Sequence, residues 1–309
     1  MPWKDRYTTS DEVSIADNGL RWPDGNRCCV LITVDLSVAA GPAGIRAADL
    51  AGAAAQFAAH DGLSNLLDTL RRHNLRATFA VPAVMARIYG DRLRAVMDAG
   101  HEIAAEGLRH EDVSALSRED EQERLSLTSQ ILTEVTGKRP AGWFSLPRQE
   151  DPFAGGTISP HTIDLLIDAG YEYFGNGLAD DAPYHWVSDF AARRSIVTLP
   201  YYYHFDDQYF LLFPRKGTGL ENADMLARNW RAEFDAQYKR GRCFHMTLHP
   251  QGSGWANRLQ VLQEFLAHMR GFPGLWNPTG AECVRHWRSV SPQAVLQAPI
   301  WQDYPGSLS

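Results

Sequence analysis

The chain has 309 residues, of which 44% are hydrophobic and 22% charged, a composition that supports a full core and excludes disordered and fibrous proteins. Thirty basic residues stand against 37 acidic ones, and the net charge of −7 gives no broad positive surface for nucleic acid. No window approaches the roughly 18 apolar residues of a membrane span, and the first residues show no apolar signal segment. We therefore expect a cytoplasmic protein that binds neither nucleic acid nor membrane.

Short apolar strands and amphipathic helices alternate along the chain. Residues 1–26 show no sustained periodicity and are predicted to form an N-terminal arm. The first buried strand is predicted over 28–34, and the small residues of 38–60 indicate a loop with a short helix. Later strands are predicted over 77–81, 102–104, 171–174, 195–199 and 242–248, separated by helices, of which the longest runs from 118 to 136.

This alternation predicts an α/β protein, either a doubly wound sheet or a (β/α) barrel. No strand is followed by a G-x-G-x-x-G or P-loop motif, so the barrel, incomplete or distorted, is favoured. We expect one catalytic barrel over 27–289 and a C-terminal tail over 290–309 that is a surface arm or an oligomer contact.

Four titratable side chains follow predicted strands. Asp35 closes the first strand, Glu106 and His110 follow the strand at 102–104, and His249 follows the strand at 242–248. Each has a structural alternative, such as a helix cap, a solvated loop residue or a surface pair. Since the carboxyl ends of barrel strands converge on one rim, we expect all four to share a site.

A carboxylate and an imidazole that face each other supply a general base and a general acid for hydrolysis. Glu106 and His110, four residues apart, could also bind one metal ion. No G-x-S-x-G elbow is present, so water is the expected nucleophile.

Residues 27–288 resemble the polysaccharide deacetylase (NodB homology) family. The matching segments are TVD at 33–35, GHEIAA at 100–105, SPHTIDLL at 159–166, TLHP at 247–250 and AECVRHW at 281–287. The resemblance implies a distorted (β/α) barrel of the NodB-homology type. It also implies hydrolysis of carbon–nitrogen bonds in N-acetylated sugars or, in one branch, in small ureides and cyclic imides.

The segments TGKRPAGWF at 136–144 and DDAPY at 180–184 are similar to that second, allantoinase-like branch. Because several of its members form homo-oligomers, the resemblance implies a dimer or tetramer that acts on a small-molecule substrate. The main prediction is thus an amidohydrolase for a small cyclic imide, ureide or related amide.

By position, Asp35 matches the family's catalytic base and His249 its general acid. The family's second Asp is replaced by Leu36 and Ser37, and Glu106 stands where members have the first His of His-x-x-x-His. The resemblance implies a zinc ion, whereas these departures favour a metal-free site. Asp35, Glu106 and His110 could still hold an ion, and then Asp35 would not be a free base.

Aromatic and basic residues near predicted strand ends are expected to bind substrate: Trp143, Phe144, Arg148, Tyr203 and His204. Phe144 stands where the family has the Arg of its Arg-x-Pro motif, with Arg148 as a substitute. Two alternative functions stay open. One is a metal-dependent N-deacetylase of an N-acetylated sugar or polysaccharide, and the other is a catalytically inactive homologue that binds a small ligand.

Overall fold

The computed structural model describes residues 8–9, 19–39, 41–145, 158–177, 180–189, 191–202, 205–212 and 222–291. Its strands are β1 (Thr8–Thr9), β2 (Cys28–Asp35), β3 (Thr78–Val81), β4 (Glu102–Ala105), β5 (Gly142–Trp143), β6 (Tyr173–Gly177), β7 (Tyr184–Asp189), β8 (Arg194–Pro200), β9 (Cys243–Leu248) and β10 (Leu275–Trp276). Its helices are η2 (Pro23–Gly25), α1 (Ala47–Leu50), α2 (Ala53–Phe57), η3 (Ala58–Gly62), α3 (Leu63–Arg72), α4 (Ala83–Ile88), α5 (Gly90–Asp98), α6 (Arg118–Thr136), α7 (Thr162–Asp168), α8 (Asp207–Leu211), α9 (Ala223–Arg240), α10 (Pro250–Ser253), α11 (Ala256–Arg270) and α12 (Gly280–Val290).

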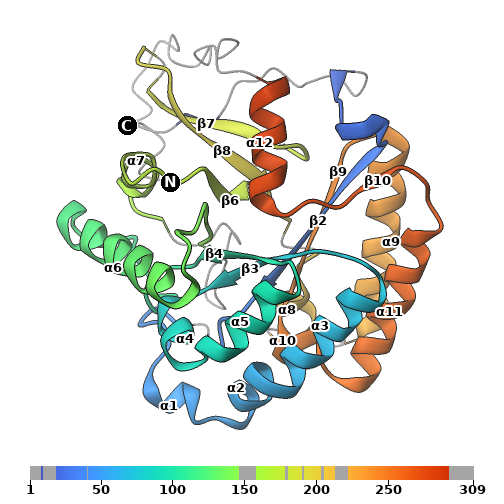
Figure 1. Cartoon of the computed structure of the whole chain (residues 1–309), viewed down its shortest axis with the longest axis horizontal. Coiled ribbons are helices and arrows are strands. Elements are labelled where there is room, and N and C mark those ends of the chain that lie inside the picture. The colour runs from blue at the N-terminus through green and yellow to red at the C-terminus, as the bar shows by residue number, and fades with distance from the viewer. Residues whose placement is uncertain are drawn as a thin grey trace, which may run out of the picture.

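The strands form a distorted (β/α) barrel, which confirms the predicted fold class. They follow the order β1-β7-β8-β6-β5-β4-β3-β2-β10, and β9 pairs with β2. Strands β2 to β6, β8 and β9 are parallel to their neighbours in the barrel, whereas β7 runs antiparallel to β8. A parallel bridge between Asp206 and Thr247 joins the chain beyond β8 to β9 and closes the barrel. Helices α3, α5, α9 and α11 lie around the outside (Figure 1).

Strand β2 shows how the sequence builds this barrel. All eight of its residues are buried, as expected for a parallel strand covered on both faces. Because side chains alternate along a strand, Val30 and Ile32 pack against the outer helices, whereas Cys29 and Leu31 belong to the second core cluster inside the barrel. Asp35 has the same parity as Cys29 and Leu31 and therefore faces the interior.

Helix α12 closes the amino end of the barrel. The backbone N–H of Gly280 donates to the Thr78 hydroxyl at 2.8 Å, and that of Ala281 donates to the Glu102 carboxyl at 2.9 Å. Thr78 and Glu102 are the first residues of β3 and β4. The carboxyl ends of the parallel strands therefore lie at the opposite end of the barrel, away from this plug.

Several elements differ from the sequence-based expectation. Strand β6 begins at Tyr173 rather than 171 and runs to Gly177, and the 38–60 region holds α1, α2 and most of the π-helical turn η3. Strands β5 and β7 were not predicted, because β5 has only two residues and β7 is an antiparallel strand added beside β8. None of the described helices is both long and apolar enough to cross a membrane.

Candidate active site

Three of the predicted residues meet at the carboxyl end of the barrel. Asp35 is the last residue of β2, and Glu106 and His249 directly follow β4 and β9. Their exposed fractions are only 0%, 1% and 1%. The Asp35 carboxylate raises the pKa of both Glu106 and His249, so these groups share one buried electrostatic environment although they lie far apart in the sequence.

His249 lies between two carboxylates. Its Nε2 is 2.8 Å from Asp35 Oδ2 and its Nδ1 is 2.7 Å from Asp207 Oδ1. A carboxylate accepts hydrogen bonds, so both ring nitrogens act as donors, which requires the imidazolium form. Burial lowers the pKa of His249, but Asp35, Asp206 and Asp207 together raise it well above its usual range. The structure thus holds a protonated histidine at the carboxyl end of β9.

Asp35 is the ionised partner of this histidine. Burial raises the pKa of the carboxyl group, but the opposing effect of His249, with help from His110 and the backbone N–H of Ser37, lowers it to about 2. The Ser37 N–H donates to Asp35 Oδ1 at 2.5 Å. Asp35 is therefore a carboxylate with one oxygen hydrogen-bonded to His249 and the other to the backbone N–H of Ser37.

Asp207 anchors the far side of the imidazole ring. Besides accepting from Nδ1, its two oxygens lie 3.0 and 2.9 Å from the backbone N of His249, and Ser253 Oγ donates to Oδ2 at 2.6 Å. Gly252 permits this approach, because a Cβ there would lie 2.9 Å from Asp207 Oδ2. These contacts fix the position of the His249 ring relative to Asp35.

Asp206 is a second buried carboxyl group beside His249, at 3.5 Å from Nδ1. Its Oδ2 accepts from Tyr201 OH at 2.6 Å and from Gln208 Nε2 at 2.7 Å. Burial and the neighbouring Asp207 outweigh the effect of His249 and raise the pKa of Asp206 to about 6.

Glu106 is held differently from these aspartates. It is fully buried, and neither carboxyl oxygen receives a hydrogen bond from a donor among the described residues. Nε2 of His110 is 3.5 Å from Oε1, which is an ion-pair separation. His110 adopts φ = 57°, in the left-handed region that residues other than glycine rarely occupy. Burial and the adjacent Asp35 carboxylate raise the pKa of Glu106 well above its usual range.

The predicted substrate-binding residues are placed as follows. Trp143 packs edge-on against Tyr171 in the core between the barrel and its outer helices. Its ring N–H donates a hydrogen bond to the Ser145 hydroxyl. Phe144 points into the barrel, where its ring packs edge-on against Tyr173. Both aromatic residues are thus engaged in core packing. Arg148, Tyr203 and His204 lie outside the described residues.

One group of three ligand-type residues stands close enough to hold an ion. Among the described residues, Asp206, Asp207 and His249 each offer a ligand atom within 4.8 Å of the other two. All three already have protein partners, since Tyr201 donates to Asp206, Ser253 donates to Asp207, and the His249 ring donates to Asp207. An ion would have to displace these hydrogen bonds and deprotonate His249. As arranged, this donor set does not fit a divalent metal.

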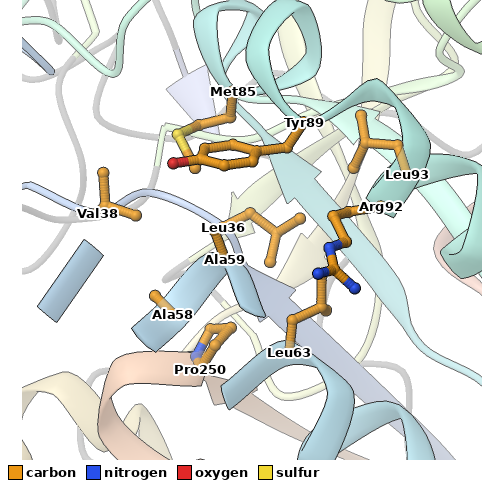
Figure 2. A pocket seen from close by; sticks show the side chains of 10 residues that line it. All are labelled: Leu36, Val38, Ala58, Ala59, Leu63, Met85, Tyr89, Arg92, Leu93 and Pro250. Carbon is orange, nitrogen blue, oxygen red and sulfur yellow. The ribbon is translucent and has the colours of Figure 1, made fainter. Parts of the chain in front are cut away.

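The ligand set expected from the sequence is not assembled either. Metal–ligand bonds of about 2.0–2.2 Å require ligand atoms no more than about 4.4 Å apart. Within the described ranges, Asp35, Glu106 and His110 form no group whose atoms all lie within 4.8 Å of one another. Leu36, one of the two residues that stand where the resemblance implies a second Asp, lines a small apolar cavity of about 20 Å³ beside Leu63 and Met85 (Figure 2).

Asp206 and Asp207 were not among the predicted site residues. The sequence does offer a signal, because two consecutive acids directly follow the aromatic run that continues β8. From that run only Tyr203 and His204 were predicted, as substrate-binding residues. Its contact with β9 is formed by barrel closure, which a local pattern does not reveal.

Comparisons with known proteins agree on one family. A profile described as polysaccharide deacetylase matches residues 51–174. A peptidoglycan deacetylase from Helicobacter pylori is 24% identical over 245 residues, which cover 71% of this chain and 81% of that protein. A crystal structure from Mycobacterium smegmatis, assigned as a polysaccharide deacetylase, superposes with a TM-score of 0.75 at 30% identity over 87% of this chain and 93% of that one. The crystal structure of PuuE allantoinase has the same fold, with a TM-score of 0.75 at 22% identity over 88% of this chain and 93% of its own.

Proposed function

Because the chain belongs to the polysaccharide deacetylase family of carbon–nitrogen hydrolases, we propose that it hydrolyses a small cyclic imide, ureide or related amide without a bound metal. Asp35 is the general base and His249 the general acid. The observation that carries this proposal is the hydrogen bond of 2.8 Å between them, in which the carboxylate is ionised and the imidazole is protonated. Base and acid thus begin the reaction in the required protonation states.

The reaction follows from these two states. Asp35 removes a proton from a water molecule as its oxygen attacks the carbonyl carbon of the substrate. When the carbon–nitrogen bond breaks, His249 donates a proton to the departing nitrogen. General acid–base catalysis of this kind contributes roughly 10²–10⁴-fold to the rate. Asp207 keeps the His249 ring in position and stabilises its charge.

Two features support a small, activated substrate. The reacting groups are almost fully buried, which suits a ligand enclosed by the barrel end better than a polymer chain. Among the described residues, the ligand atoms of Asp206, Asp207 and His249 lie close enough to hold an ion but are already engaged in hydrogen bonds, and a Lewis acid contributes several kcal/mol to transition-state stabilisation. The hydrolysis of an imide or ureide requires less stabilisation of the transition state, because a second carbonyl group stabilises the leaving nitrogen.

A metal-dependent N-deacetylase of an N-acetylated sugar is the second candidate. It is supported by the grouping of Asp206, Asp207 and His249, and by the similarity to the peptidoglycan deacetylase of Helicobacter pylori. For this activity, an ion would have to replace the hydrogen bonds that now hold the three side chains.

One screen separates the candidates. Purified protein is assayed against cyclic imides, ureides and N-acetyl sugars before and after dialysis with a chelator, and its zinc content is measured. We expect turnover of an imide or ureide that survives the chelator. Release of acetate that depends on one zinc per chain would establish the sugar deacetylase instead. Failure to hydrolyse any compound would favour an inactive homologue.

A further inference from the structure

Two glutamates face the barrel interior, Glu102 at the start of β4 and Glu106 directly after its end, and their surroundings differ. Glu102, at the amino end of the strand, accepts hydrogen bonds from Tyr173 OH at 3.0 Å and from the backbone N–H of Ala281 at 2.9 Å. Glu106, at the carboxyl end, receives none from the described residues. Buried polar groups are normally satisfied, so an exception of this kind at an active site calls for a functional explanation.

The groups that face Glu106 fix its charge state. Burial and the charges of Asp35 and Asp206 raise the pKa of Glu106, whereas the charge of His249 lowers it. Nε2 of His110 lies 3.5 Å from Glu106 Oε1. Both ring nitrogens of His249 are already hydrogen-bonded, one to Asp35 and the other to Asp207. A second full negative charge beside Asp35, buried and without a donor, is strongly unfavourable. Glu106 therefore carries the proton of the pair, and Asp35 carries the charge.

A neutral carboxyl group has an O–H to donate, and neither Glu106 oxygen has a hydrogen-bond partner among the described residues. We propose that Glu106 is a catalytic residue that donates this proton to the carbonyl oxygen of the substrate. This inference rests on the proposed function. It assigns to Glu106 the polarising role that a metal ion would otherwise have in this fold.

The proton transfers form a closed cycle. Water attacks the carbonyl carbon, its proton passes to Asp35, and the carbonyl oxygen takes the proton of Glu106, which gives a neutral tetrahedral intermediate. Glu106 then recovers that proton as the carbonyl re-forms, the carbon–nitrogen bond breaks, and the nitrogen takes a proton from His249. The products are a carboxylic acid and an amide or urea N–H, which stay in one molecule when the substrate is cyclic. Asp35 then passes the proton that it took from water to His249 along their hydrogen bond. This step restores the ionised Asp35 and the protonated His249.

Substitution of Glu106 tests this role on the best substrate found in the screen. Glu106→Gln keeps a neutral side chain with an N–H donor, whereas Glu106→Ala removes the donor. We expect kcat to fall by about 10²–10³-fold in the alanine variant, as when an oxyanion-hole donor is lost. We expect it to fall less than about tenfold in the glutamine variant. Glu102→Gln is the matched control on the same strand, with an expected loss of stability but unchanged kcat.

A spectroscopic measurement reports the proton without using activity. The infrared difference spectrum of wild type minus Glu106→Gln at pH 7 is expected to show the carbonyl band of a protonated carboxylic acid. A carboxylate band in its place would overturn the proposal, as would equal losses of kcat in the glutamine and alanine variants. Stoichiometric zinc that is lost in Glu106→Gln would show that Glu106 is a ligand and would also overturn it.

These outcomes separate the inference from the function on which it rests. If the wild type hydrolyses an imide or ureide and Asp35→Asn does not, but Glu106→Gln is as inactive as Glu106→Ala, only the role of Glu106 is wrong. If the wild type hydrolyses none of the compounds, the proposed function and the role of Glu106 are both wrong.

Discussion

Asp35 and His249 are 214 residues apart in the chain, yet the Nε2 of the histidine lies 2.8 Å from a carboxylate oxygen of the aspartate. The pairing arises because β2 and β9 are adjacent parallel strands, with Val34 opposite Leu248. The residue after Val34 is Asp35 and the residue after Leu248 is His249, so both lie at the same end of the barrel. Two neighbouring parallel strands that end at the same level are therefore enough to bring the proposed base and the proposed acid together.

The first prediction concerns the base. Replacing Asp35 with Asn keeps the size of the side chain but removes the ability to accept a proton from water. We expect kcat/KM to fall by about 10²–10⁴-fold, the usual contribution of general acid–base catalysis. Steady-state kinetics on the best imide or ureide would measure the loss. Asp98→Asn, on the exposed face of α5, is the matched control, and unchanged turnover in Asp35→Asn would rule out Asp35 as the base.

The second prediction concerns the role of Asp207 as a positioning residue. Its negative charge helps to raise the pKa of His249, and the acid must be protonated to act. Activity is therefore lost on the alkaline side as His249 deprotonates. In Asp207→Asn the pKa of His249 falls, so we expect the alkaline limb of the kcat profile to move to lower pH. Asp224→Asn, at an exposed helix start, should leave the limb in place. An unmoved limb in Asp207→Asn would contradict this role.

The alternation of apolar runs and helices predicted an α/β protein, and the absence of a dinucleotide motif together with the family resemblance favoured the barrel over a doubly wound sheet. Asp35, Glu106 and His249 were candidates because each follows such a run. The direction of the side chains at the end of β5 was not predictable: Trp143, its last residue, and Phe144, which follows it, are both apolar, so no alternation shows which one faces inward. The contact between Asp207 and His249 also depends on barrel closure, which no local pattern encodes.

A third prediction follows from the pH dependence of the Asp35–His249 pair. The folded pKa of Asp35 is lowered from 3.8 to about 2, so its contribution to stability, about 2 kcal/mol, is present above pH 4 and is lost as pH falls through 2. The folded pKa of His249 is raised, so its contribution is complete below about pH 6.5 and is lost as pH rises through the folded value.

Urea unfolding of wild type and His249→Gln between pH 2 and pH 9 checks this prediction. We expect the difference in the free energy of unfolding to be largest between about pH 4 and 6.5 and to shrink on both sides. A difference that is constant across this range would show that the two groups are not paired as charges.

The last prediction concerns the packing that supports the site from inside the barrel. Phe144 lies against Gly175, and a Cβ at residue 175 would come within 2.2 Å of the Phe144 ring. Gly175→Ala therefore overfills the interior, and we expect it to lower the free energy of unfolding by about 1–3 kcal/mol. Combining it with Phe144→Leu removes the clashing ring atoms and should recover part of the loss. Gly41→Ala, where nothing lies within 4 Å of the added Cβ, serves as the control. If Gly175→Ala melts like the wild type, the ring of Phe144 is not packed against the backbone of β6.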